Sequence, residues 1–178
     1  MLHRLRTAIG SVLLLAAVIG ATPAAAGPWQ CVTFARAFSG VDIFGDAATW
    51  WQQAAGRYEE GAAPRVGGVL VFKAQGRLRV GHVATVSEIV SAREIKVTHA
   101  NWSPIGGSRG QVENDVSVID TSDAGDWSRV RVWYGPSHDI GKTDYAVFGF
   151  IYGSRDAAPT TTYAVTEVEA MPIQLAGL

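Results

Sequence analysis

Residues 82–102 of the chain read HVATVSEIVSAREIKVTHANW, and this stretch decides the fold. Apolar residues, many of them β-branched, dominate on both sides of Ser91-Ala92, a pattern typical of strands. The short connection between the two runs leaves room only for a tight turn. The stretch therefore predicts an antiparallel pair of strands over residues 82–90 and 94–102.

Helical patterns precede this pair of strands. Phe34 and Phe38 lie four residues apart and Gly40 is a natural stop, so we expect a helix over residues 28–39. A second short helix is expected over residues 46–56, with Asp46 as its N-cap.

Further extended segments lie on either side of the central pair. One is the apolar run at residues 69–72, and others are expected at 116–119, 129–134 and 147–152. Two helices followed by about six strands indicate an α+β domain, with the N-terminal helices packed on a mostly antiparallel sheet.

The first residues have the pattern of a secretory signal peptide. Arg4 and Arg6 form a basic start, an apolar run covers residues 8–20, and Ala24-Ala25-Ala26 provides the small residues of a cleavage site. The run is shorter than the ~20 apolar residues that span a bilayer. The expected organisation is a signal peptide at 1–26, a folded domain at 27–153 and a flexible tail at 154–178.

Charge points to no particular partner. The sequence has 15 Lys and Arg and 16 Asp and Glu, and removal of Arg4 and Arg6 leaves 13 basic residues, a net charge of about −3. No basic run is present that would favour nucleic acid or a polybasic membrane contact. We expect binding neither to nucleic acid nor, after cleavage, to the membrane.

Cys31 is the only cysteine of the sequence. An exported protein normally pairs its cysteines, so an unpaired one is either a small buried apolar residue or a reactive thiol. Its place in the first turn of the expected helix favours the thiolate, because unpaired backbone N–H groups and the helix dipole stabilise negative charge there.

Two histidines are candidates for a base that activates this thiol. His82 opens the first strand of the central pair and His99 lies near the end of the second. If paired residue numbers in the two strands sum to about 183, His82 lies opposite Asn101 and diagonal to His99, and all three side chains share a face. A change of register by one residue would separate them.

Four short motifs then occur in a fixed order, and together they resemble a CHAP domain. CHAP stands for cysteine, histidine-dependent amidohydrolase/peptidase, a branch of the papain-like NlpC-type superfamily. The motifs are Gln30-Cys31, PRVGGVLVF at 64–72, GHVATV at 81–86 and HANW at 99–102. The resemblance implies a papain-like CHAP fold over residues 27–153.

The resemblance also implies a role for each matched residue. Cys31 corresponds to the nucleophile, His82 to the general base and Gln30 to the glutamine of the oxyanion hole. His99 stands where many CHAP domains have Glu, as in the Cys-His-His arrangement of NlpC-type peptidases. The residue that orients His82 is therefore either His99 or Asn101.

The implied function is that of a secreted or periplasmic enzyme, a monomer without a cofactor, which hydrolyses amide bonds of peptidoglycan. Its substrate would be peptidoglycan or its stem peptides, and targeting could involve a cell-wall partner protein. Trp29, Trp50 and Trp51 are expected mostly in the core, with Trp50 and Trp102 as candidates for lining a substrate groove.

Three alternatives accompany this interpretation. A metal site of Cys31, His82 and His99 has no supporting ligand spacing, so we expect no metal. A catalytically silent module of the same fold could bind the wall or a wall enzyme. An acyl transferase would use the same thiol and pass the acyl group to an amine.

Overall fold

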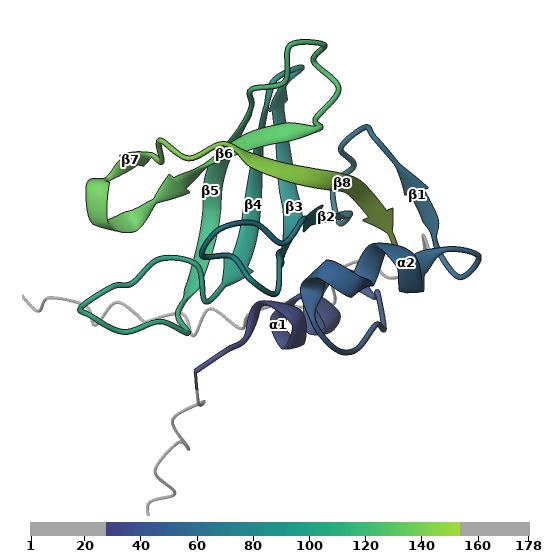
Figure 1. Ribbon diagram of the computed structural model, residues 1–178, viewed down its shortest axis with the longest axis horizontal. Coiled ribbons are helices and arrows are strands. Elements are labelled where there is room, and N and C mark those ends of the chain that lie inside the picture. The colour runs from purple at the N-terminus through teal and green to yellow at the C-terminus, as the bar shows by residue number, and fades with distance from the viewer. Residues whose placement is uncertain (1–27, 154–178) are drawn as a thin grey trace, which may run out of the picture.

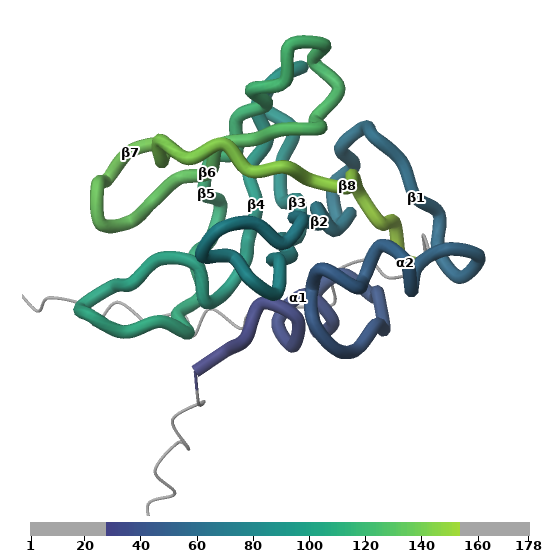
Figure 2. The backbone as a smooth tube through the Cα atoms, in the orientation of Figure 1, coloured from purple at the N-terminus to yellow at the C-terminus, as the bar shows by residue number. Residues whose placement is uncertain are grey.

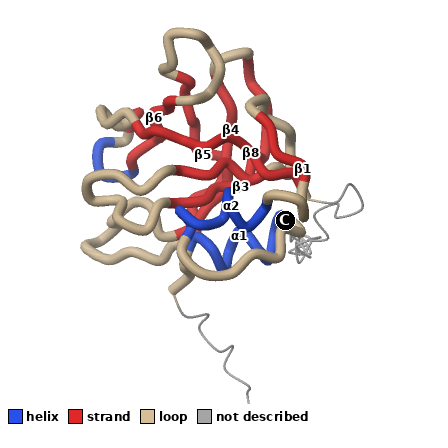
Figure 3. The backbone as a smooth tube through the Cα atoms, turned by 45° about the vertical axis from the view of Figure 1, so that its right-hand side comes forward, coloured by secondary structure: helices blue, strands red, loops and turns tan. Residues whose placement is uncertain are grey.

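The computed structural model describes residues 28–153, so the predicted signal peptide at 1–26 and the predicted tail at 154–178 lie outside the described residues. The helical elements are α1 (Cys31–Ser39), η1 (Ala47–Thr49), α2 (Trp50–Ala54) and η2 (Gly135–Ser137). The strands are β1 (Glu59–Gly61), β2 (Val69–Phe72), β3 (His82–Ser91), β4 (Glu94–Ala100), β5 (Val112–Asp120), β6 (Arg129–Tyr134), β7 (Asp139–Ile140) and β8 (Tyr145–Tyr152). Both α-helices lie together on one side of the strands (Figures 1 and 3).

The strands of this part of the chain form one antiparallel sheet in the order β1-β8-β2-β3-β4-β5-β6-β7. An additional pairing between β6 and β8 closes six of them into a barrel. The α+β class and the antiparallel sheet are confirmed. The sheet has two more strands than the six expected, because β1 and β7 have three and two residues and no apolar alternation that would have predicted them.

The central pair of strands, β3 and β4, has the register that the sequence predicted. Thr85 lies opposite Thr98 and Val86 opposite Val97, so the paired numbers sum to 183. Nearer the turn, two irregularities shift the register. The expected alignment therefore holds at Thr85 and Val86, the β3 pairs nearest to His82.

Strand alternation divides the apolar side chains into two cores. The barrel core contains residues that point into the closed sheet, such as Phe72 on β2 and Ala84 and Val86 on β3. The helix-side core contains Val71 and Val83 from the opposite face of the same strands. Burying a side chain of this size stabilises the fold by ~1.5–3 kcal/mol relative to leaving it exposed.

Helix α1 covers the helix-side core and ends where the sequence indicated. Ala35 is buried in that core, and Gly40 forms the C-cap with a φ of 70° in the left-handed region. The second predicted helix consists of η1 and α2, and Asp46 is the N-cap residue of η1 through its backbone, without a side-chain capping bond.

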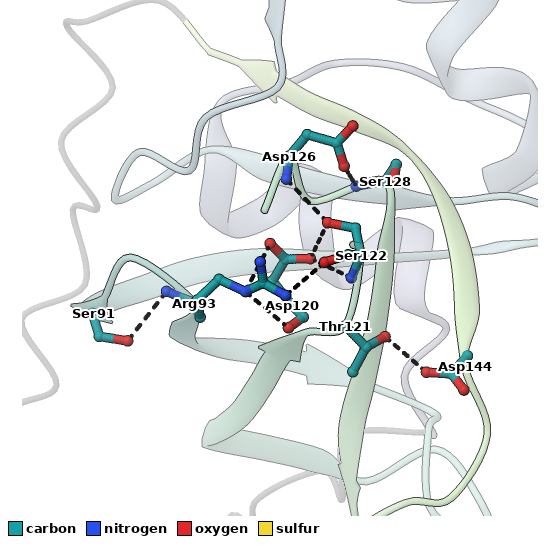
Figure 4. A network of polar contacts seen from close by, with 8 residues as sticks. All are labelled: Ser91, Arg93, Asp120, Thr121, Ser122, Asp126, Ser128 and Asp144. Atoms are coloured by element: carbon teal, nitrogen blue, oxygen red, sulfur yellow. Dashed lines mark hydrogen bonds and ion pairs between the residues drawn. The ribbon is translucent and has the colours of Figure 1, made fainter. Parts of the chain in front are cut away.

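A polar network at the other end of the β3–β4 pair connects it to the segment after β5 (Figure 4). The Arg93 guanidinium, in the β3–β4 turn, lies 3.4 Å from the Asp120 carboxylate and donates a hydrogen bond of 2.6 Å to the Ser122 carbonyl. The Asp120 side chain is fully buried and also accepts from the Ser122 hydroxyl at 2.7 Å. A buried carboxylate requires such partners, so this network stabilises the end of the barrel away from α1.

Within residues 28–153, no helix is long and apolar enough to cross a membrane.

Candidate active site

Cys31 is the first residue of α1, and the residues around it fix the start of the helix. Gln30 is the N-cap, with extended backbone dihedral angles. The Thr33 hydroxyl accepts a hydrogen bond from the Gln30 N–H at 3.3 Å and donates to the Gln30 carbonyl at 2.9 Å. Thr33 therefore performs the local capping, and the Gln30 side chain is left for contacts outside the helix.

The Cys31 thiol is partly buried and directed at the start of β3. Burial raises the pKa of this thiol, and the nearby backbone N–H groups of Val83, Val32 and Cys31 itself lower it. Burial has the larger effect, so the pKa of the Cys31 thiol is raised above its ordinary value. The raised pKa opposes the expectation of a thiolate at the helix start, because loss of solvation outweighs the effect of the amides.

His82 is the first residue of β3, as the sequence predicted, and its ring is buried at the end of the barrel. His82 Nε2 lies 3.0 Å from His99 Nδ1, within hydrogen-bond distance. The rings of Phe72 and Trp102 pack around it, with centroids 5.5 and 4.8 Å from that of His82. The two histidines that share a face by strand register are thus in direct contact.

Burial keeps both imidazoles neutral. It lowers the pKa of His99 to about 3 and, together with the nearby His99 and Arg109, lowers the pKa of His82 well below its usual range. Nδ1 of His82 is the ring nitrogen that His99 does not occupy, so it is the one available to exchange a proton with another group. Among residues 28–153, no hydrogen bond joins either ring to the Cys31 sulfur, although Val83, the next residue after His82, contacts that sulfur.

Asn101 does not contact either imidazole through a hydrogen bond within the described residues. Its side-chain N–H donates to Gln30 Oε1 at 2.8 Å. Asn101 follows the last residue of β4 and has a φ of 64°, in the left-handed region that Asn tolerates better than most residues. This backbone conformation ends the strand alternation from which a common face with His99 was predicted, and it turns the amide toward α1.

The segment before α1 docks on the loop that follows β4, at the bottom left of Figure 2. The Trp29 N–H donates to the Gly110 carbonyl at 2.9 Å. Gly110 has a φ of 107°, and a Cβ there would lie 2.4 Å from the Pro28 Cβ, so only glycine allows this approach. The docking places Gln30 within reach of Asn101.

The two tryptophans predicted to line a substrate groove are buried. Trp50 has no exposed surface and lies in the helix-side core. Trp102 is 6% exposed, lies in the barrel core and donates its indole N–H to the Trp133 carbonyl at 3.0 Å. Neither side chain is exposed to a ligand, which corrects that expectation. Burying a large aromatic side chain removes much apolar surface from water, so both tryptophans stabilise the core instead.

Two charged residues near the histidines were not predicted from the sequence. Arg109 donates to the Trp102 carbonyl, and its charge is one of the causes that lower the pKa of His82. Glu113 is buried on β5 and pairs with His99 across the β4–β5 ladder. The signal that could have identified Glu113 is an acidic residue at an inward-facing position of a strand. Recognising that position requires the register of β5, which the sequence does not show.

In residues 28–153, no group of three or more His, Cys, Asp or Glu side chains is placed to hold a metal ion. The arrangement instead combines a thiol at a helix start, a neutral buried imidazole with one free nitrogen, and an exposed amide held by a second amide. These are the parts that acyl transfer through a covalent thioester requires.

No curated protein matches the sequence at a significant level. The family model described as the CHAP domain matches residues 22–101, a range that includes α1 and strands β1 to β4 and ends at Asn101.

Proposed function

We propose, on the premise that residues 22–101 make this chain a member of the CHAP domain family, that it is a cysteine amidohydrolase or peptidase. CHAP domains are in general amidases or peptidases that act on peptidoglycan. The finer proposal is that this chain hydrolyses an amide bond of peptidoglycan through an acyl-enzyme on Cys31. We propose the same papain-like arrangement of helix and sheet that the family resemblance implies.

The observation that carries this proposal is the contact between His82 Nε2 and His99 Nδ1 at 3.0 Å. This contact occupies one nitrogen of His82 and leaves Nδ1 for the thiol. In an imidazole that acts as a base beside a nucleophile, the second nitrogen is normally held by a third group. Asn101 bonds to Gln30 instead, so we propose His99 as the residue that orients His82.

The first half of the proposed reaction forms the acyl-enzyme. Nδ1 of His82 accepts the Cys31 proton as the sulfur forms a bond to the amide carbonyl carbon. The carbonyl oxygen becomes an oxyanion, and the Cys31 N–H and a Gln30 side-chain N–H donate to it. Collapse of this intermediate breaks the C–N bond, and His82 gives its proton to the leaving amine.

The second half returns the enzyme to its starting state. His82 takes a proton from water, the water oxygen bonds to the thioester carbon, and the C–S bond breaks. The proton then returns from His82 to the sulfur, and a carboxylic acid leaves. No oxidant, reductant or metal takes part in this sequence of steps.

The low solvation of the site supports a base that is neutral when the substrate arrives. Because burial lowers the pKa of His82, the ring is unprotonated at neutral pH and can accept a proton. Because burial raises the pKa of Cys31, the thiol keeps its proton until that transfer. Charge would therefore develop only during the reaction. The backbone amides at the helix start would stabilise the negative charge at that stage.

We further propose export to the periplasm or beyond the cell, from the signal-peptide pattern at residues 1–26, and action as a monomer on the wall or its stem peptides. A cell-wall partner protein is one route by which the enzyme could be directed to its substrate. These proposals fit a peptidoglycan substrate, which lies outside the cytoplasm.

Digestion of purified peptidoglycan tests the proposal. The mature chain is expected to release fragments with a new amine and a new carboxyl group, identified by mass, and Cys31→Ala is expected to release none while keeping the fold. Products joined to a second amine would indicate a transferase. Wall binding without cleavage by either protein would indicate a silent binding module, and undiminished cleavage by Cys31→Ala would contradict the nucleophile.

A further inference from the structure

His99 has a second ring nitrogen, Nε2, which the His82 contact does not use. Within residues 28–153 this nitrogen is buried and has no hydrogen-bond partner. Its charged neighbour is Glu113, whose Oε1 lies 3.9 Å away. A buried ring nitrogen beside a carboxylate oxygen, slightly beyond hydrogen-bond distance, indicates a contact that closes with a small movement.

Glu113 is held in position by the fold. It pairs with His99 across the β4–β5 ladder, and its side chain is 6% exposed. Its Oε1 accepts a hydrogen bond from the Ser103 N–H at 2.7 Å. Taking a carboxylate out of water is costly, and one backbone hydrogen bond satisfies only part of its capacity to accept. His99 Nε2 is the donor that could satisfy more of it.

The position of the proton on His99 determines the position of the proton on His82. If His99 carries its proton on Nε2, facing Glu113, its Nδ1 is an acceptor and His82 must donate from Nε2. Nδ1 of His82 then has a free lone pair. If His99 carries its proton on Nδ1, then His82 accepts on Nε2, carries its own proton on Nδ1 and cannot act as a base toward Cys31.

We propose that Glu113 is a positioning residue for the cysteine site, which holds the proton of His99 on Nε2 and thereby leaves Nδ1 of His82 free to accept the thiol proton. This inference rests on the proposed function, because it assigns His82 as the base. Glu113 lies on the neighbouring strand, outside the matched residues 22–101.

Glu113 is also placed to stabilise the charge that the reaction creates. When His82 accepts the thiol proton, the His82–His99 pair becomes cationic in a buried environment where Arg109 is an unfavourable neighbour. Within residues 28–153, the titratable or charged groups placed around this pair are Cys31 from α1, Arg109 from the loop before β5, and Glu113 from β5. Glu113 is the acid among them, so its charge would favour protonation of His82 in the reaction.

The wild-type protein provides the first test, which needs no variant and no substrate. Nitrogen-15 NMR of the imidazoles at neutral pH distinguishes protonated from unprotonated ring nitrogens. We expect a protonated Nε2 and an unprotonated Nδ1 on both His82 and His99. A proton on Nδ1 of His82 would overturn the proposal.

Glu113→Gln tests the role of the charge with little change of shape. We expect it to slow alkylation of Cys31 by iodoacetamide and hydrolysis of peptidoglycan by ~10–100-fold, the range found when a group that orients a metal-binding imidazole is removed. The acidic limb of the kcat/KM profile should move to lower pH, since loss of the negative charge makes the imidazolium less stable. A purely structural role would leave that limb unchanged.

Asp115→Asn is the matched control, because it removes one charge from an exposed position two residues along the same strand. It should leave alkylation, hydrolysis and the pH profile unchanged. If Glu113→Gln leaves all three measurements unchanged, as expected for Asp115→Asn, Glu113 has no positioning role. This holds even if Cys31→Ala is inactive and the proposed function is therefore supported. If Cys31→Ala still hydrolyses peptidoglycan, the proposed function fails, while the NMR and alkylation results still decide the role of Glu113.

Discussion

At the scale of the residue, Asn101 shows how one side chain can serve a site through an unexpected neighbour. Gln30 Oε1 accepts from the Asn101 amide, so the Gln30 N–H groups must face away from that contact. A free glutamine amide could present either its oxygen or its nitrogen to a substrate. Asn101 thus selects the orientation of Gln30 that the proposed contact with an oxyanion requires.

Two substitutions at Asn101 separate this role from a role on His82. Asn101→Gly keeps the left-handed backbone but removes the donor, and kcat should fall by about 10-fold or more, bounded by the ~10²–10³-fold cost of losing an oxyanion donor. The kcat of Asn101→Asp should fall at least as far. A carboxylate at residue 101 would attract the Gln30 side-chain N–H and turn Gln30 Oε1 outward. Steady-state hydrolysis measures both variants. Alkylation of Cys31, which forms no oxyanion, should be unchanged, and slower alkylation would indicate action through His82 instead.

At the scale of the element, the start of β3 determines where His82 lies. Gly81 precedes it with a φ of 70°, and its N–H donates to the Leu78 carbonyl. The neighbouring Val80 carbonyl accepts from the Ala48 N–H at 2.9 Å, which ties the β2–β3 connection to η1. The strand therefore begins at a point where loop and helix backbones are in close contact.

Gly81→Ala should disturb both stability and the site. A Cβ at this position would lie 2.7 Å from the Phe72 oxygen and 2.8 Å from the Ala48 nitrogen, both backbone atoms. We expect a loss of ~1–3 kcal/mol in the free energy of unfolding, measured by urea denaturation, and reduced hydrolysis as His82 shifts.

Gly76→Ala is the control for Gly81→Ala. Gly76 also has a positive φ, of 50°, but a Cβ there would have no atom within 4 Å. It should show only the smaller cost of backbone strain, with hydrolysis unchanged. Equal effects of the two substitutions would mean that the close contact around Gly81 does not position β3.

At the scale of the whole molecule, closure of the barrel removes both histidines from water. The pairing of β6 with β8 completes the ring of strands around the barrel core, where Trp102 stacks near His82 and His99. The resulting pKa changes link the stability of the whole domain to pH.

The domain should therefore lose stability in mild acid. The unfolded chain takes up protons on His82 and His99 below pH ~6.5, whereas the folded chain does not until far lower pH, about 3 for His99. As the pH falls from 6.5 to 4.5, the free energy of unfolding should decrease. At the acid end of this range, each histidine should contribute about 1 kcal/mol per pH unit to the decrease. Urea denaturation across this range measures the slope.

Replacing one histidine at a time identifies the source of that slope. His99→Gln should reduce it by about half, whereas His138→Gln, at an exposed position, should leave it unchanged. A flat profile in the wild-type protein would mean that the imidazoles take up protons while the domain remains folded.

Local patterns in the sequence predicted the elements and the positions of two candidate site residues. Local periodicity and glycine stops predicted α1 and most strands, and the register assumed for the central pair matches β3 and β4 at Thr85–Thr98 and Val86–Val97. Cys31 at the helix start and His82 at the strand start follow from those elements, because a position within a helix or strand depends on neighbours a few residues away.

Only the tertiary structure decided which of these residues meet. Closure of the barrel through β6 and β8, burial of Trp50 and the pairing of Glu113 with His99 depend on contacts between segments far apart in the chain. Asn101 reaches Gln30 because a single left-handed residue ends the alternation of β4. The raised pKa of the Cys31 thiol likewise results from burial by distant residues, a long-range property that no local pattern contains.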